Sequence, residues 1–208
     1  MLSLHVCPAL EQLSAPLSGL VSLHTLRLSF TPLHDVSPAL SALRALSHLS
    51  LEFSHQLSLP ANLSVLTGIE HLLLRDNQQL ANVGPLAALT RLTHLDLTRC
   101  PAVTALPPMP TLVLLIANVS GVRQLPALPR LEVLEMRACE LQRLPARLST
   151  LTTLRRLHTV GNPQLPVLEL EGLRSLARLT RLECRRCEFT KAPAWVAAAG
   201  VSCDLPPA

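Results

Sequence analysis

Three histidines recur at one fixed interval, since His48, His71 and His94 are each 23 residues apart. Imidazole nitrogens bind zinc, and imidazole also changes its charge close to neutral pH. Nucleophilic catalysis finds no support, because Asp96 lacks a candidate nucleophile beside it and the chain has no glycine-rich phosphate loop, GxSxG elbow or HExxH motif. The chemistry open to these histidines is therefore metal binding or a pH-sensitive contact.

The elements that must position the histidines are repeats of the pattern LxxLxLxx. Nine copies occur at spacings of 19 to 25 residues, and each is followed by Asn, Cys, Ser or Thr. Their central aliphatic residues are Leu2, Leu26, Leu49, Leu72, Leu95, Leu115, Leu134, Leu157 and Leu182. In the fifth copy, LTHLDLTRC, Leu95 and Leu97 are two residues apart, so both point to one face of a short strand, which we expect to be core. The histidines take the third position of three consecutive copies.

This repeat resembles the leucine-rich repeat, and the resemblance covers nearly the whole chain. It implies a right-handed leucine-rich repeat solenoid of about nine coils, with a parallel concave sheet and a convex side of mixed extended, 3₁₀ and short-helical segments. Residues 1–208 would form one domain, with repeats over 1–190 and a C-terminal capping segment over 191–208. Within that segment Val201, Cys203 and Leu205 alternate like one last strand, and Trp195 is a candidate to cover the end of the core.

The small polar residue that ends each copy has a structural role in this fold, because it can bond backbone groups that are buried between coils. The column reads Cys7, Thr31, Ser54, Asn77, Cys100, Ser120, Cys139, Asn162 and Cys187. Of the six cysteines, Cys184 instead replaces a core leucine and Cys203 lies outside the scheme. Neither end carries the clustered cysteines that cap secreted leucine-rich repeats. We therefore expect reduced, buried thiols and no metal bound by them.

The convex segments differ in length. Copies two to five and eight have room for a short helix or 3₁₀ turn, whereas the sixth and seventh copies, read from Leu106 to Leu134, are shorter and carry Leu-Pro-x-x-Pro spacings. Those compact copies resemble the LPxLP repeats of bacterial effectors, whose convex side is extended. Longer copies, such as LTRLTHLDLTRCPAVTALPPM, resemble the LxLxxCxxLxxLP repeats of plant resistance receptors and of injected effectors. The mixture most resembles the leucine-rich repeat domains of type III effectors from plant-associated bacteria.

In such effectors the repeats select a host target, and a separate domain, often a ubiquitin ligase, carries the chemistry. The resemblance implies an effector-like or adaptor scaffold for protein–protein interaction, without enzymatic activity, cofactor or catalytic residues. The alternative is the substrate-recognition domain of a larger catalytic effector whose ligase domain is not part of this chain. A Cys-x-Asp ligase motif is not matched, because Asp204 follows Cys203 directly.

We expect the concave face to bind the partner, because stacked strands align the outward positions of successive copies. Its N-terminal end would present Phe30 and Phe53 as an aromatic anchor near Arg75, its middle would be apolar, and its C-terminal end would be rich in arginine. The predicted partner-binding residues are Phe30, Phe53, Arg75, Val113, Leu114, Ile116, Val119, Arg137, Arg156, Arg181 and Arg185. Alternatively, the phenylalanines fold onto the strand edge and the valines only satisfy strand propensity.

Charge is unevenly distributed along the chain. Residues 1–120 contain five basic and six acidic groups, whereas residues 121–208 contain thirteen basic and eight acidic groups. Arginine forks match carboxylate or phosphate pairs, so the C-terminal end is a candidate to hold an acidic segment of a partner protein. Alternatively, the arginine excess reflects genome composition, and many of these side chains are simply solvated. Nucleic acid is disfavoured, because no stacking aromatics accompany these arginines.

No membrane association is expected, because the apolar runs are far shorter than the roughly 20 residues that span a bilayer. The N-terminus lacks the basic region of a secretory signal, which favours a cytoplasmic protein or one delivered into a host cytosol. For the histidines, zinc needs ligand nitrogens roughly 3.4 Å apart, whereas the outer two strands would lie about 9.6 Å apart. A half-exposed histidine ladder is therefore expected, with no metal and with a pH-sensitive contact as its functional alternative.

Overall fold

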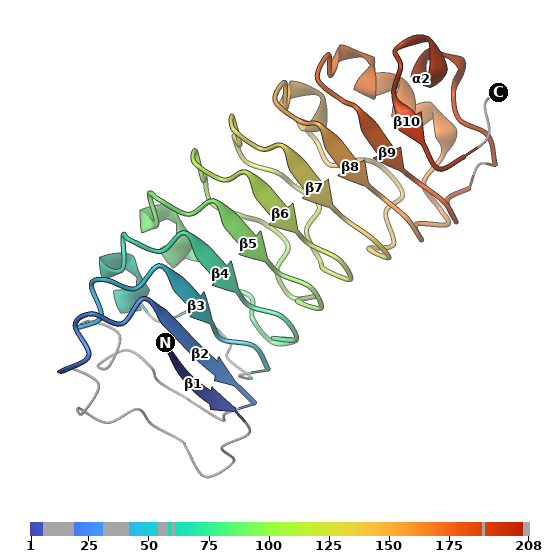
Figure 1. Cartoon of the computed structure of the whole chain (residues 1–208). Coiled ribbons are helices and arrows are strands. Elements are labelled where there is room, and N and C mark those ends of the chain that lie inside the picture. The colour runs from blue at the N-terminus through green and yellow to red at the C-terminus, as the bar shows by residue number, and fades with distance from the viewer. Residues whose placement is uncertain (6–18, 31–41, 54–57, 60, 189, 206–208) are drawn as a thin grey trace.

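The computed structural model describes residues 1–5, 19–30, 42–53, 58–59, 61–188 and 190–205. In this part of the chain ten short strands form one parallel sheet in sequence order, from β1 at the N-terminal end to β10 at the C-terminal end (Figure 1). The strands are β1 (Leu2–His5), β2 (Thr25–Ser29), β3 (His48–Ser50), β4 (His71–Leu73), β5 (His94–Asp96), β6 (Leu114–Ile116), β7 (Val133–Glu135), β8 (Arg156–His158), β9 (Arg181–Glu183) and β10 (Ser202–Cys203).

The register of the sheet is the one that the repeat predicts. The central leucines of the nine copies pair in succession, from Leu2 with Leu26 to Leu157 with Leu182. From Leu26 to Leu182 these side chains are at most 1% exposed. The alternation of one residue inward and the next outward therefore sets a continuous core on one side and a continuous row of outward positions on the other. We call the outward side of the sheet the sheet face.

The opposite, convex side carries short helices and extended segments (Figure 1). The 3₁₀ helices are η2 (Ala61–Val65), η3 (Gly84–Ala88), η4 (Leu148–Thr150) and η5 (Val167–Ser175), which follow β3, β4, β7 and β8. The convex segment of the sixth copy, after β6, contains no 3₁₀ helix, as its proline spacing predicts, and Gln124 within it bridges to Ala105 and Ala146 on either side.

Two copies differ from the expectation. The seventh was predicted to be short and extended but carries η4, because the 23-residue spacing between Leu134 and Leu157 leaves room for a turn. The fifth was predicted to have room for a helix, but its convex segment forms no 3₁₀ helix. Pro107, Pro108 and Pro110 remove three backbone donors there and fix extended dihedral angles. The convex segment of the second copy lies largely outside the described residues, as do the ladder residues Cys7, Thr31 and Ser54.

Except for Ser120, whose Oγ donates to the Ala117 carbonyl oxygen of its own coil at 2.7 Å, the described ladder residues donate to backbone carbonyls of the preceding coil. Asn77 Nδ2 donates to the Leu51 oxygen at 2.7 Å, Cys100 Sγ to Leu74 at 3.0 Å and Cys139 Sγ to Ala117 at 3.0 Å. Asn162 Nδ2 likewise donates to Met136 at 2.9 Å. The ladder is thus a set of coil-to-coil hydrogen bonds, and burial raises the pKa of the Cys100 thiol to about 11.

The residue before each ladder position adopts a left-handed conformation, which the sequence did not reveal. Its φ lies between 50° and 77° in each of the eight described cases, and only one of them is glycine. These residues are Phe30, Phe53, Asp76, Arg99, Val119, Ala138, Gly161 and Arg186. The turn after each strand imposes this costly backbone geometry, which the hydrogen bonds between coils stabilise.

The C-terminal segment closes the sheet. Helix α2 (Ala194–Ala198) leads back to β10, which pairs with β9 so that Cys203 lies opposite Leu182. Trp195 is half-buried and packs against the core, as expected for a residue that covers its end.

Candidate functional site

The histidine column lies on the N-terminal half of the sheet face. His48 and His71 stack with ring centroids 4.3 Å apart, and His71 and His94 stack at 4.2 Å. The outer two rings are two such spacings apart, too far for one ion to bind all three, so the column forms a ladder. Burial and the neighbouring imidazoles lower the pKa of His71, and burial lowers the pKa of His94.

Hydroxyl groups orient two of these rings. Thr93 Oγ1 lies 3.0 Å from the Glu70 carbonyl oxygen, which can only accept, so the hydroxyl donates there and accepts the Nδ1 proton of His94 at 2.8 Å. Ser47 Oγ makes the same pair of contacts with the His24 carbonyl oxygen and His48 Nδ1. In the neutral form of each ring, the proton therefore lies on Nδ1 and the lone pair on Nε2. Beside this ladder the sheet face has a hollow of about 220 Å³, whose lining includes Met1, Arg27, His48, Ser50, His71 and Leu73.

The structure brings Phe30 and Phe53 together, with stacked rings 4.0 Å apart and 13° from parallel. Phe30 is 45% exposed, and Phe53 is half-buried. Both occupy the left-handed turn beyond the strand and therefore flank the sheet face at its carboxyl edge, as Val119 does in a later copy.

Arg75 forms an ion pair with Asp96, which sequence analysis considered only for catalysis. Its Nε lies 2.7 Å from Asp96 Oδ2, and Asp96 is only 2% exposed. The hydrogen bond to Asp96 raises the pKa of Arg75. Asp96 also accepts the backbone N–H of Thr98 through Oδ1 at 2.9 Å. Arg75 therefore compensates a buried carboxylate, while its exposed part still faces solvent.

The predicted apolar middle is a contiguous surface. Val113, Leu114, Ile116 and Val133 are half-buried, and Val119 is 45% exposed. The register pairs Leu114 with His94 on one side and with Val133 on the other. The apolar residues thus join the histidine ladder directly.

At the C-terminal end, acids and arginines alternate around His158. Arg137 lies 3.5 Å from Glu135 and 3.4 Å from Glu183, and it donates to His158 Nδ1 at 2.8 Å. A guanidinium can only donate, so Nδ1 accepts and the proton of the neutral ring lies on Nε2. Burial lowers the pKa of His158 although Glu183 and Glu135 oppose this effect. We call these four residues the Arg137 network.

The remaining predicted arginines differ in what they contact. Arg181 lies 2.7 Å from Glu183, and Arg185 donates to the Asp204 carbonyl oxygen at 2.8 Å. Arg156, which is exposed on β8, has no ion pair within the described part of the chain. The basic end of the sheet face is therefore largely charge-compensated, with Arg156 as its available cation.

Sequence analysis missed one further cluster of potential metal ligands. Cys184, Cys203 and Asp204 place three potential ligand atoms within 4.8 Å of one another. The sequence held a signal, since Cys184 and Cys187 form a CxxC pair, but it did not show that Cys203 returns to them.

No helix among the described residues is long and apolar enough to cross a membrane.

The fold is that of leucine-rich repeat proteins. A leucine-rich repeat protein of Leptospira interrogans superimposes with a TM-score of 0.64 and 18% identity, over 97% of this chain and 64% of that one. The leucine-rich repeat domain of the type III effector XopL gives 0.60 and 20%, over 99% and 76%. A chain of the Drosophila Toll–Spätzle complex gives 0.66 and 17%, over 91% and 27%. No protein-family model matches the sequence, and the search among curated proteins finds no match.

Proposed function

We propose that the protein is a recognition scaffold whose sheet face binds a partner protein. The observation that carries this proposal is the register, which joins the histidine ladder, the apolar middle and the Arg137 network without interruption. Ile116 pairs with Asp96 on one side and with Glu135 on the other. Half-exposed apolar groups bounded by polar ones are typical of protein interfaces.

The charges favour a partner that brings an acidic segment to the C-terminal end of the face. Arg156 is the cation available for a carboxylate, and Arg181 and Arg185 are exposed enough to share their acids with a partner. Phe30 and the apolar middle would supply the buried anchors, since aromatic and aliphatic groups contribute most once water is displaced. Nucleic acid is disfavoured, because Glu135 and Glu183 lie among these arginines.

Affinity capture with matched variants tests the proposal. Leu114→Asp with Ile116→Asp changes the sheet face, and Leu168→Asp changes a side chain on η5 that is 75% exposed on the convex side. We expect the sheet-face variant to lose the proteins captured by the wild type and the convex variant to retain them. Circular dichroism of both variants would check that they are folded. Loss of the captured proteins from the convex variant alone would place the binding surface on the opposite side.

An effector-like or adaptor role in a bacterial or host cytosol is part of this proposal. It is supported by the LPxLP spacing, by the similarity in fold to the XopL domain and by the five described cysteines, which are free thiols. The alternative, substrate recognition within a larger catalytic effector, makes a different prediction. The captured proteins would then be modified by the protein encoded by the full reading frame and not by residues 1–208 alone.

A further inference from the structure

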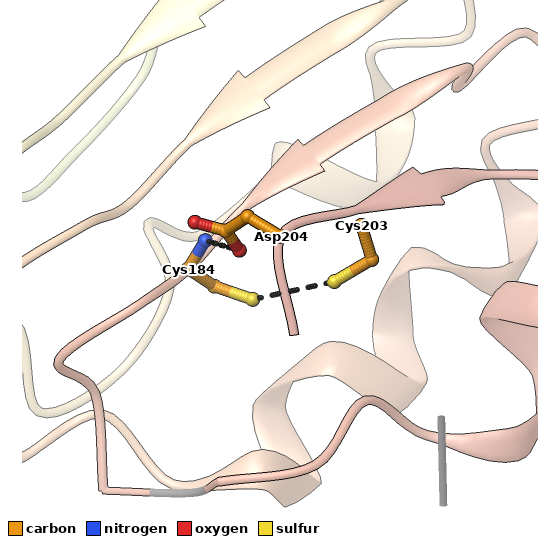
Figure 2. A group of neighbouring side chains, drawn as sticks. All are labelled: Cys184, Cys203 and Asp204. Carbon is orange, nitrogen blue, oxygen red and sulfur yellow. Dashed lines mark hydrogen bonds between the residues drawn. The ribbon is translucent and has the colours of Figure 1, made fainter. Parts of the chain in front are cut away.

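Two thiols from different elements meet at the C-terminal end of the solenoid. Cys184 follows β9 by one residue, and its side chain points inward like that of Leu182, two residues earlier. Cys203 on β10 pairs with Leu182, so it is a diagonal neighbour of Cys184 across the last strand pair. The two sulfur atoms lie 3.8 Å apart (Figure 2).

The distance between the two sulfur atoms matches that between two thiolate ligands of one zinc ion. Zinc–sulfur bonds of about 2.3 Å at a tetrahedral angle place two thiolate sulfurs about 3.8 Å apart. A disulfide instead requires a sulfur–sulfur bond of about 2.05 Å. The two thiols are therefore spaced as two ligands of one ion.

Asp204 supplies a third donor on the same side. One of its carboxylate oxygens lies within 4.8 Å of both sulfurs. Its Oδ1 accepts the backbone N–H of Cys184 at 2.8 Å (Figure 2). Its Oδ2 accepts the backbone N–H of Arg185 at 3.3 Å. Such outer contacts hold a ligating carboxylate in place.

We propose that Cys184, Cys203 and Asp204 form a binding site for a thiophilic divalent cation, with Zn²⁺ as the fitting ion. The site joins the segment after β9 to β10 and so links the cap to the last coil. Cys203 and Asp204 are half-buried, which leaves the fourth coordination position to water. Cys187 stays in the ladder, where its thiol donates to the Thr159 carbonyl oxygen at 3.3 Å.

The surroundings explain why the Cys184 thiol would not be charged without an ion. Burial, Cys203 and Asp204 together raise the pKa of Cys184, so that its thiol is protonated at neutral pH. A bound dication compensates both thiolates and the carboxylate, and binding releases the two thiol protons to solvent.

Cobalt and zinc titrations of the reduced protein under nitrogen test this site without a partner protein. We expect one Co²⁺ per chain, with the near-ultraviolet charge-transfer absorption of cobalt–thiolate bonds, and displacement by Zn²⁺. Cys203→Ser should abolish that absorption, and Asp204→Asn should weaken binding at least about tenfold. The matched control is Cys139→Ser, since Ser120 already fills the same ladder position in the preceding coil.

Several results would overturn the proposal. They are the absence of the charge-transfer band in the wild type, an equal band in Cys203→Ser, or its loss in Cys139→Ser. Peptide mapping that finds a Cys184–Cys203 disulfide in air, together with no Co²⁺ binding to the reduced protein, would instead identify a redox-active thiol pair. Cys203→Ser changes a half-buried residue, so the test does not require a substitution of the buried Cys184, which could unfold the last coil.

Discussion

The two halves of the sheet face solve the same packing problem differently. Parallel strands about 4.8 Å apart force equivalent side chains of neighbouring coils into contact. In the N-terminal half those neighbours are alike, as in the stacks of Phe30 on Phe53 and of the three histidines. In the C-terminal half they are complementary, as in the Arg137 network.

The difference shows what a regular solenoid permits at its surface. Stacking of like rings is favoured when they are neutral, and the lowered pKa values of His71 and His94 favour the neutral forms of those two rings. Charged side chains need partners of opposite sign: Glu135 and Glu183 each pair with an arginine two residues away in the same copy, and Glu183 also contacts Arg137 from two coils further on. Both halves share one core, so a substitution in the core should affect both halves, whereas a substitution on the sheet face should affect one of them.

The largest effect is expected from Leu95→Asp, which alters the core on β5 between the two halves. Leu95 is 1% exposed, so an unpaired carboxylate would be buried there, and the loss of stability should exceed about 4 kcal/mol. Thermal unfolding followed by circular dichroism would show loss of both halves together. Leu114→Asp on the neighbouring strand is the control, because that side chain is half-buried and points outward. Equal melting temperatures for wild type and Leu95→Asp would contradict the register.

A smaller effect is expected from Arg75→Ala, which removes the cation beside the buried Asp96 carboxylate. We expect a loss of about 1–3 kcal/mol in the free energy of unfolding by urea. Arg99→Ala is the matched control, since its contact with Asp76 at 3.3 Å is exposed and should contribute less than about 1 kcal/mol. Equal losses of stability in the two variants would show that Arg75 is not needed to stabilise the buried Asp96 carboxylate.

Once a partner protein is identified, binding kinetics separate the two halves. Arg156→Glu should slow association about threefold to tenfold at low salt, because unpaired charge acts before contact. Arg181→Glu should act less, since Glu183 already compensates that side chain. Phe30→Ala should speed dissociation instead. Surface plasmon resonance measures both rates, and an unchanged association rate in Arg156→Glu would remove the basic end from the binding surface.

The smallest effect concerns pH. The pKa values of His71, His94 and His158 are lowered in the fold, so the unfolded chain takes up protons first as the pH falls. Stability should be fully present above about pH 6.5 and decline as the pH drops through the lowered pKa values. His71→Asn should flatten the decline in melting temperature measured between pH 7 and the acid side. An identical pH profile in that variant would refute the contribution of the N-terminal ladder.

Much of the fold could be predicted from the sequence. The period of two within each strand fixes which side chains are buried, and the 19-to-25-residue period between strands fixes the register of the sheet. The core leucines and the hydrogen-bonding role of Asn77, Cys100, Cys139 and Asn162 follow from these periods alone. The stacking of His48, His71 and His94 follows as well, since equal spacing and equal position place them side by side.

Only the tertiary structure decided which side chains pair and where the chain turns. The left-handed turn placed Phe30, Phe53 and Val119 beside the sheet face, because backbone geometry overrode residue preference. The directions of the two side chains pair Arg75 with Asp96, so that Arg75 is not a free cation on the sheet face. The return of the chain through α2 brought Cys203 to Cys184. The sequence does not predict this contact, because the path of the C-terminal segment depends on its packing against the last coil and follows no repeat.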